Sequence, residues 1–329
     1  MSKIVECQLC PRRCRLGEGQ RGDCRVRVNL EGKLFTLVYG KPCAVHVDPI
    51  EKKPLFHVRP GIGAFSIATA GCNLHCKFCQ NWQISQRPPE ETENYDLPPE
   101  KVVAAAIKNR CRSIAYTYSD PIIFYEYMLD TARLAKQAGL LNLMITAGFI
   151  EQPPLLELCP FIDAANIDLK GITNEYYAKM SSATLQPVLD TIITMKKQGV
   201  WIELTNLIVP TWNDREADIR LLCRWIADHV GADTPLHFSR FWPMHLLTNL
   251  PPTPVETLNL AREIAGQEGL HYVYVGNIPG HEGNNTYCPV DRQVLIKRAG
   301  YMILENNLTE GRCKFCQTKI PGLWDEMGH

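Results

Sequence analysis

The alternation of strand-like and helix-like segments between Ala64 and Val275 restricts the fold more than any other feature of the sequence. Apolar runs in this region have the length of buried strands, and helical stretches separate most of them. The predicted strands are Ala64–Ala70, Ser113–Tyr118, Leu141–Thr146, Ala164–Asp168, Trp201–Val209, Leu236–Phe241 and Tyr272–Val275. Strands joined through helices form parallel sheets with right-handed crossovers. Six or seven strands are too few for a closed eight-stranded barrel, so we predict an α/β fold with a partial (β/α)6 TIM-like barrel.

Proline and glycine mark the ends of several helices in this region. Pro98-Pro99-Glu100 is typical of a first helical turn, where proline is tolerated because its missing N–H would have no partner. Gly139 and Gly199 stand just beyond two other helical stretches, where glycine usually ends a helix. These signals support helices between the strands.

Polar and glycine-containing segments follow five of the predicted strands. In parallel sheets, ligands bind beyond the carboxyl ends of the strands, where the following loops meet. The segments at this edge are the loop of Cys72, Cys76 and Cys79, and the runs Tyr116–Asp120, Thr146–Gly148, Asn166–Lys170 and Pro210–Asp214. The sequence therefore predicts the active site at this edge of the sheet.

Cysteine is the most unusual component of the chain, which has 14 cysteines in 329 residues. Most of them lie in three groups: Cys7, Cys10, Cys14 and Cys24; Cys72, Cys76 and Cys79; and Cys288, Cys313 and Cys316. A secreted disulfide framework is the alternative, but such frameworks are typical of short chains with a signal peptide. We therefore expect the cysteine groups to bind metal in a reducing compartment.

Charge and hydropathy exclude several other classes of protein. Acidic and basic residues balance at 35 each, so no basic surplus points to nucleic acid or to a membrane surface. The first ten residues contain no apolar signal region, and no run approaches the roughly 20 apolar residues of a membrane span. We expect a cytoplasmic protein with neither nucleic acid nor membrane as a partner.

The central cysteine group has the spacing C-x3-C-x2-C within Gly71–Cys79. Three thiolates on one short loop can bind three irons of a [4Fe–4S] cluster and leave the fourth iron without a protein ligand. That open iron can chelate the amino and carboxylate groups of a cofactor. Zinc is the alternative, but zinc sites use C-x2-C pairs, and no fourth cysteine follows nearby.

This motif resembles the signature of the radical S-adenosylmethionine (SAM) superfamily, including the aromatic Phe78 before the last cysteine. The resemblance covers essentially the whole chain and points to the AmmeMemoRadiSam-system branch, which is related to pyruvate formate-lyase activating enzymes. The segments that carry it are Asp48–Leu55, Gly71–Leu74, Cys79–Trp82, Tyr116–Tyr118, Asp168–Lys170 and Tyr274–Asn277. The resemblance implies reductive cleavage of SAM at the cluster to a 5′-deoxyadenosyl radical, which abstracts hydrogen from a substrate.

The resemblance also assigns residues to SAM and to catalysis. Asp168 and Lys170 resemble the Asp-x-Lys of the activating enzymes and are the expected catalytic residues near SAM. The expected cofactor-binding residues from the resemblance are Phe78, Thr117, Tyr118, Ser119, Asp120, Thr146, Gly148 and Asp168. Glu203 and Asn206 are added because they lie on the fifth predicted strand, from which they could reach SAM. For Ser119 and Asp120, which precede Pro121, a helix N-cap is the alternative role.

The N-terminal cysteine group offers four thiols within 18 residues, at Cys7, Cys10, Cys14 and Cys24. Four thiolates can bind either zinc or an auxiliary iron–sulfur cluster, and the sequence does not choose between these metals. A segment without metal is a further alternative. We expect a Cys-rich metal-binding segment over residues 1–58.

The C-terminal tail, residues 281–329, resembles a zinc ribbon formed by Cys288, Cys313 and Cys316. Asp291 replaces the second cysteine of the first knuckle, and a carboxylate oxygen can bind zinc, although His281 could supply a nitrogen instead. A tail without metal is the competing interpretation. The barrel would then occupy residues 59–280.

There are three hypotheses for function, two from the resemblance and a third that the cysteine content alone would allow. The first is a radical SAM enzyme that acts on a small molecule or cofactor precursor, together with a flavodoxin or ferredoxin as reductant and the two other proteins of the AmmeMemoRadiSam system. The second is an activating enzyme that acts on a peptide loop of a glycyl radical enzyme. The third, from another class, is an iron–sulfur or metal carrier without enzymatic activity.

Overall fold

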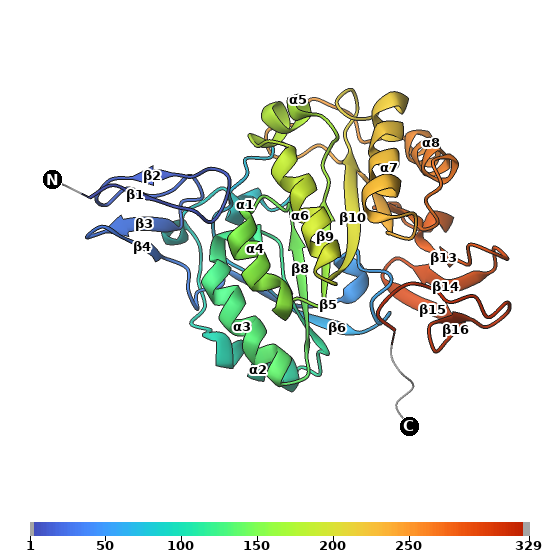
Figure 1. Ribbon diagram of the computed structural model, residues 1–329, viewed down its shortest axis with the longest axis horizontal. Helices are drawn as coiled ribbons and strands as arrows, with labels where there is room; N and C mark the ends of the chain where they lie inside the picture. Colours follow the sequence, from blue (N-terminus) through green and yellow to red (C-terminus); the bar gives the residue numbers. More distant parts are fainter. Residues whose placement is uncertain (1–2, 325–329) are drawn as a thin grey trace.

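The computed structural model describes residues 3–324 and places a central α/β half-barrel between two small β domains (Figure 1). The strands of the central sheet are β5 (Ala44–Pro49), β6 (Gly63–Ala68), β7 (Ser113–Tyr116), β8 (Leu141–Thr146), β9 (Ala164–Asp168), β10 (Trp201–Ile208), β11 (Leu236–Arg240) and β12 (Val273–Gly276). They lie in the order β12-β11-β10-β9-β8-β7-β6-β5. β6 to β12 are parallel, which confirms the predicted partial barrel.

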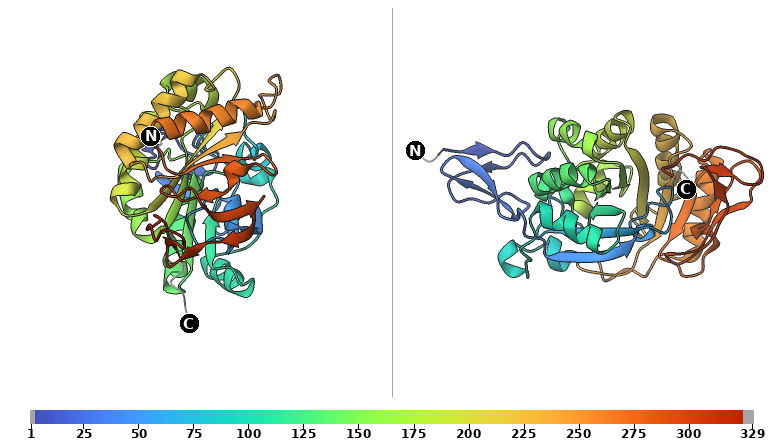
Figure 2. Two further views of the ribbon diagram at one scale, coloured as in Figure 1. Left: turned by 90° about the vertical axis from the view of Figure 1, so that its right-hand side faces the viewer. Right: turned by 90° about the horizontal axis from the view of Figure 1, so that it is seen from below.

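Helices cover the outer face of this curved sheet, as Figure 2 shows. They are α2 (Pro99–Lys108), α3 (Tyr125–Gln137), α4 (Gln152–Leu158), α6 (Gln186–Lys197), α7 (Glu216–Val230) and α8 (Val255–Gln267), with the short α1 (Trp82–Ser85) and α5 (Asn174–Tyr176) in the loops at the carboxyl edge. Apolar side chains of the helices, such as Leu222 and Ile226 of α7, are buried against the strands in the largest core. Each such side chain contributes about 1.5–3 kcal/mol.

The expected helix ends are present. Pro99 is the first residue of α2. Gly139 and Gly199 follow α3 and α6 with φ of 75° and 80°, a left-handed conformation that glycine adopts without steric cost. None of the helices among residues 3–324 has the length and apolar character of a membrane span.

The N-terminal domain consists of two antiparallel hairpins. Its strands are β1 (Val5–Glu6), β2 (Arg15–Leu16), β3 (Arg27–Leu30) and β4 (Lys33–Thr36). The predicted end of this domain at residue 58 is too late, because Ala44–Pro49 forms β5 and pairs antiparallel with β6 in the barrel sheet. Residues 1–2 of the predicted segment lie outside the described residues.

The C-terminal domain packs against the other end of the barrel (Figure 1). It contains β13 (Thr286–Tyr287), β14 (Val294–Ala299), β15 (Met302–Asn306), β16 (Leu308–Thr309) and β17 (Arg312–Cys313). Leu295 and Ile296 share a core with Phe56 and Tyr274 of the barrel. Arg298 is buried above the Phe56 ring at 4.1 Å and donates to the Phe56 carbonyl. Residues 325–329 of the predicted tail lie outside the described residues.

The segment before β6 closes the amino end of the barrel through the buried carboxylate of Glu203. The N–H groups of Phe56 and His57 donate to this carboxylate at 3.0 and 2.8 Å, and His237 Nε2 lies 2.7 Å from it. Burial raises the pKa of Glu203, but the hydrogen bond from His237 and the nearby His57 bring it below its usual value. The expectation that Glu203 binds SAM is therefore wrong, since Glu203 lies in the amino-terminal half of β10 and both of its oxygens already accept hydrogen bonds.

Replacing Glu203 with Ala should destabilise the fold by about 3–5 kcal/mol, because the buried N–H groups of Phe56 and His57 would lose their acceptor. The free energy of unfolding from urea titration measures the effect. Exposed Glu93→Ala is the matched control and should stay within about 0.5 kcal/mol of the unchanged protein. Equal stability of the two variants would contradict the structural role of Glu203.

Candidate active site

The three-cysteine loop, residues 69–81, follows β6 at the carboxyl edge of the sheet. Cys72 and Cys76 are buried, and Cys79 is half-buried. Within residues 3–324, these sulfurs do not belong to any group of three or more metal-binding atoms that lie within 4.8 Å of one another. A [4Fe–4S] cluster suits their wider spacing, because each thiolate binds a different iron.

Hydrogen-bonding groups lie beside each of the three sulfurs. Cys76 Sγ is 3.4 Å from Ser181 Oγ, and Cys79 Sγ is 3.2 Å from Ser85 Oγ. The N–H of Leu74 donates to Cys72 Sγ at 3.4 Å. Donors to sulfur stabilise the negative charge of a thiolate-bound cluster and tune its reduction potential. The donor set therefore fits a site-differentiated [4Fe–4S] cluster.

A π-helical turn, η5 (Tyr177–Ser181), holds the cysteine loop in place. The carbonyls of Met180 and Ser181 accept hydrogen bonds from the N–H groups of Lys77 at 2.9 Å and His75 at 3.0 Å. Single π turns are rare and occur often at functional sites. Sequence reasoning missed Ser181, because its role depends on a turn that has no local sequence signal.

Asp168 and Lys170 lie together at the end of β9. Lys170 Nζ donates to Asp168 Oδ2 at 2.7 Å and lies 5.8 Å from the centre of the Phe78 ring. Burial lowers the pKa of Lys170, but the Asp168 carboxylate and the Cys76 sulfur raise it well above its usual value. The structure thus brings together three of the predicted site residues: Asp168, Lys170 and Phe78 of the cysteine loop.

The Asp120 side chain links the loops that follow β7 and β8 through hydrogen bonds. Its carboxylate accepts from the N–H of Ile122 at 3.1 Å, which caps the 3₁₀ turn η3 (Pro121–Phe124). It also accepts from Thr146 Oγ1 at 3.0 Å and from the N–H of Ala147 at 2.9 Å. The capping role is therefore present, and the loops after β7 and β8 are joined through this side chain. Burial raises the pKa of Asp120.

The neighbours of Asp120 have separate roles. Ser119 Oγ donates to the Thr69 carbonyl at 2.7 Å, directly before the cysteine loop. Thr117 donates its N–H to the Ile67 carbonyl at 3.0 Å. Tyr118 adopts a left-handed φ of 65°, and its hydroxyl donates to Asp48 in the barrel interior. Ser119 thus adjoins the cysteine loop, whereas the Tyr118 side chain is directed into the barrel.

The remaining predicted residues support backbone at the same edge. Gly148 has φ of 70°, and a Cβ there would lie 3.1 Å from Ile167, so both conformation and space favour glycine. Thr146 Oγ1 accepts from the N–H of Gly148 at 3.0 Å. Asn206 Nδ2 donates to the carbonyl of Leu169 at 2.7 Å, between the two expected catalytic residues.

Asp48 and Lys53 form a buried ion pair in the barrel interior for which the sequence predicted no role. Lys53 Nζ donates to Asp48 Oδ2 at 2.6 Å and lies 4.4 Å from the centre of the Tyr118 ring. Burial lowers the pKa of Lys53 to about 8, although Asp48 opposes this shift. Both residues belong to the segment Asp48–Leu55, which carries part of the family resemblance. This resemblance is the sequence signal that could have identified the pair as functional.

The other two cysteine groups each gather in space. Cys7, Cys10, Cys14 and Cys24 line one cavity beside the active-site loop. In the C-terminal domain, the ligand atoms of Cys288, Asp291, Cys313 and Cys316 all lie within 4.8 Å of one another. All 14 cysteines lie in the described part of the chain and are free thiols.

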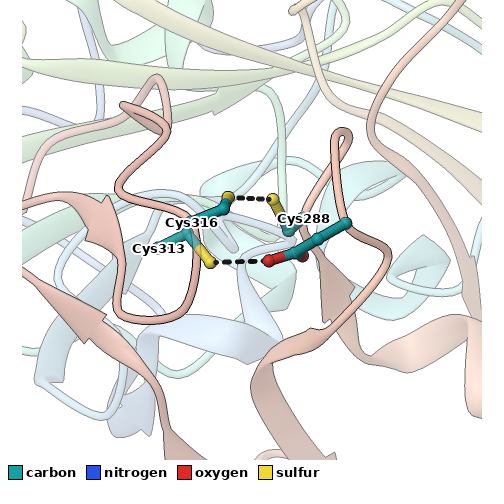
Figure 3. Close-up of side chains that lie close together, drawn as sticks. Cys288, Cys313 and Cys316 are labelled. Carbon is teal, nitrogen blue, oxygen red and sulfur yellow. Dashed lines mark hydrogen bonds between the residues drawn. The ribbon is translucent and has the colours of Figure 1, made fainter.

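The C-terminal group has the dimensions of a tetrahedral metal site (Figure 3). Cys288 Sγ lies 3.5 Å from Cys316 Sγ, and Cys313 Sγ lies 3.5 Å from Asp291 Oδ2. A tetrahedral zinc ion with Zn–S bonds of about 2.3 Å separates its sulfurs by roughly 3.8 Å. His281 is directed elsewhere, because its Nε2 lies 2.8 Å from Asn259. The donor set is therefore three sulfurs and one carboxylate.

Comparison with known proteins adds the class of the protein. Residues 66–223 match the model of the Radical SAM superfamily. The uncharacterized protein MJ0808 of Methanocaldococcus jannaschii is 49% identical over 318 residues, which are 96% of this chain and 95% of that protein. A pyruvate formate-lyase-activating enzyme of Listeria monocytogenes is 24% identical over 184 residues, which are 51% of this chain and 70% of that protein.

Solved structures share the fold at low sequence identity. A radical SAM methyltransferase from Sphaerobacter thermophilus has a TM-score of 0.52 and 16% identity, over 65% of this chain and 66% of that chain. Streptococcus suis SuiB bound to S-adenosylmethionine has a TM-score of 0.51 and 10% identity, over 69% of this chain and 53% of that chain.

The chain belongs to the radical SAM superfamily and is an enzyme related to the pyruvate formate-lyase activating enzymes. Membership implies a [4Fe–4S] cluster and SAM as cofactors.

Asp120→Ala should lower the free energy of unfolding by about 2–4 kcal/mol in the absence of SAM, because three buried donors lose their acceptor. Urea titration without added cofactor is the measurement, and exposed Asp228→Ala should remain within about 0.5 kcal/mol. An Asp120 variant that keeps full stability but loses SAM affinity would show that the side chain serves the cofactor instead.

We expect the full chain to bind one zinc in the C-terminal group, with Asp291 as the weakest ligand. Asp291→Cys should tighten zinc and Asp291→Ala should weaken it, both measured by competition with a chromogenic chelator. Cys313→Ala serves to assign the zinc to this group, and exposed Asp96→Ala should leave the affinity unchanged. Identical zinc affinity in the Asp291 and Asp96 variants would remove Asp291 from the ligand set.

Proposed function

We propose that this enzyme cleaves SAM reductively at a [4Fe–4S] cluster bound by Cys72, Cys76 and Cys79, and then abstracts hydrogen from a small-molecule or cofactor-precursor substrate. The observation that carries the proposal is the position of the C-x3-C-x2-C loop at the carboxyl edge of the half-barrel, against Asp168 and Lys170. When bound, the cluster supplies one electron to the SAM sulfonium, which releases methionine and a 5′-deoxyadenosyl radical.

The chain's own residues contribute binding and positioning. The three thiolates would hold three irons, while Ser181 and Ser85 place hydroxyls beside Cys76 and Cys79. Lys170 brings a positive charge to the same edge and is oriented by Asp168. These two residues are proposed to contact SAM or the substrate. Ser119 is the proposed contact for the SAM amino group, since it adjoins the cysteine loop through Thr69.

A loop across the barrel mouth supports a small substrate. Residues 241–254, between β11 and α8, reach the cysteine loop on the far side of the sheet. Leu246 donates its N–H to the Lys77 carbonyl at 2.9 Å, and the His245 ring stacks on Trp82 at 5.4 Å. Such a cover helps to exclude water from reactive intermediates and restricts the access of a folded protein.

The barrel interior supports a polar substrate. Asp48 and Lys53 form an ion pair there, and Thr205 Oγ1 donates to Asn166 Oδ1 at 2.9 Å. The similarity to pyruvate formate-lyase-activating enzymes favours the alternative, in which a peptide loop is the substrate. A flavodoxin or ferredoxin is the proposed reductant, and the two other AmmeMemoRadiSam-system proteins are the proposed partners.

With SAM and dithionite, the anaerobically reconstituted protein should form 5′-deoxyadenosine and methionine slowly even without substrate. Chromatography of the products is the measurement. The triple replacement of Cys72, Cys76 and Cys79 with Ala should reduce product by more than 100-fold, because no site-differentiated cluster can form. Cys111→Ala, at an isolated buried cysteine, should retain activity. A reconstituted protein with iron but without these products would favour the carrier hypothesis.

A further inference from the structure

Four cysteines of the N-terminal domain surround one cavity. The lining residues are Cys7, Cys10, Cys14, Cys24, Leu9, Arg12, Gly22, Arg27, Asn73, Ile122 and Ile123. The cavity volume is about 20 Å³, so the thiols lie close around a small space. The two hairpins create this convergence, for example through the hydrogen bond from the Cys7 N–H to the Cys14 carbonyl at 2.9 Å. The cavity lies beside the active-site loop, which contributes Asn73 to its lining.

Gly22 keeps the space between two of the sulfurs free. A Cβ at this position would lie 3.6 Å from Cys24 Sγ and 3.7 Å from Cys14 Sγ. A larger side chain would therefore extend between the thiols. Gly22 therefore leaves the space between these two sulfurs without a side chain.

The spacing of these sulfurs differs from that of the C-terminal group. In the C-terminal group, the four ligand atoms lie within 4.8 Å of one another, as a tetrahedral ion requires. Among the described residues, no three of the N-terminal sulfurs come that close together. A cubane binds each thiolate to its own iron and therefore accommodates sulfurs that lie farther apart.

Two arginines present unpaired donors in the same cavity. Arg27 is buried, and its Nε has no hydrogen-bond partner among the described residues. Arg12 Nη2 is likewise buried without a partner. Other atoms of these guanidinium groups bind Glu126 at 2.6 Å and Asp23 at 2.9 Å. Buried donors without acceptors are costly, and a cluster with four thiolates is anionic and can accept from them.

The active-site loop forms one wall of this cavity. Arg12 Nε donates to the Asn73 carbonyl at 3.0 Å. Gly71 has φ of 87°, and a Cβ there would lie 2.4 Å from the carbonyl oxygen of Cys24. The backbone of Cys24 therefore packs directly against Gly71, the residue that precedes Cys72.

We propose that Cys7, Cys10, Cys14 and Cys24 bind a second [4Fe–4S] cluster, ligated by four thiolates and packed against the cysteine loop of the active site. The sulfur spacing and the unpaired arginine donors both match a cubane rather than zinc. This inference does not depend on the proposed SAM chemistry, because all four ligands belong to the N-terminal domain.

The test uses the full chain with Cys72, Cys76 and Cys79 replaced by Ala, reconstituted anaerobically with ⁵⁷Fe and sulfide. We expect about four irons and four sulfides per chain and the Mössbauer spectrum of a [4Fe–4S] cluster. Adding Cys10→Ala and Cys24→Ala should remove this iron. The matched control, Cys43→Ala with Cys159→Ala in the same background, should retain it, because these thiols are isolated.

A second variant distinguishes loss of the metal site from misfolding caused by the cysteine replacements. Gly22→Leu keeps all four thiols and places a side chain between Cys14 and Cys24, so the iron content should fall at least threefold while the unfolding transition is retained. Unchanged iron in Gly22→Leu would overturn the proposed location. Zinc in place of iron, lost with Cys10 and Cys24, would overturn the cluster assignment, as would a chain without metal in this domain.

Discussion

The parallel arrangement of β6 to β12 is the constraint on which the site depends. Each of these strands ends at the same edge, so loops that are far apart in sequence meet there. The cysteine loop follows β6, Asp120 follows β7, Thr146 ends β8 and Asp168 ends β9. These residues lie close together because the parallel topology brings the strand ends to one edge. No sequence motif is needed to specify their contact.

Buried carboxylates fasten this framework at both ends. Asp120 joins the loops after β7 and β8 at the carboxyl edge, and Glu203 holds the segment of Phe56 and His57 at the amino edge. In each case backbone N–H groups donate to the carboxylate, which satisfies polar groups that would otherwise be buried without partners. These acids therefore stabilise the barrel, whereas the Asp168–Lys170 pair remains available at the edge.

The three cysteine groups illustrate how sulfur spacing distinguishes metal chemistry. The C-terminal group is compact enough for one tetrahedral ion and sits in a core shared with the barrel. The N-terminal and central groups are wider and touch each other through Cys24 and Gly71. The contact places two proposed clusters in neighbouring segments, while the C-terminal group belongs to the domain that packs with Phe56 near the closed amino end.

The sequence by itself determined the architecture, because apolar runs separated by helices permit little other than a parallel sheet, and the observed strands coincide closely with the predicted ones. It also determined the chemistry of the central motif, because three thiolates at fixed spacing on one loop are a local property. The tertiary structure alone decided the direction of individual side chains. Glu203 is on a predicted strand, yet its donors come from Phe56 and His57, more than 140 residues away. Likewise, the four N-terminal thiols share a spacing that allows zinc or a cluster, and only the folded hairpins set the distances between their sulfurs.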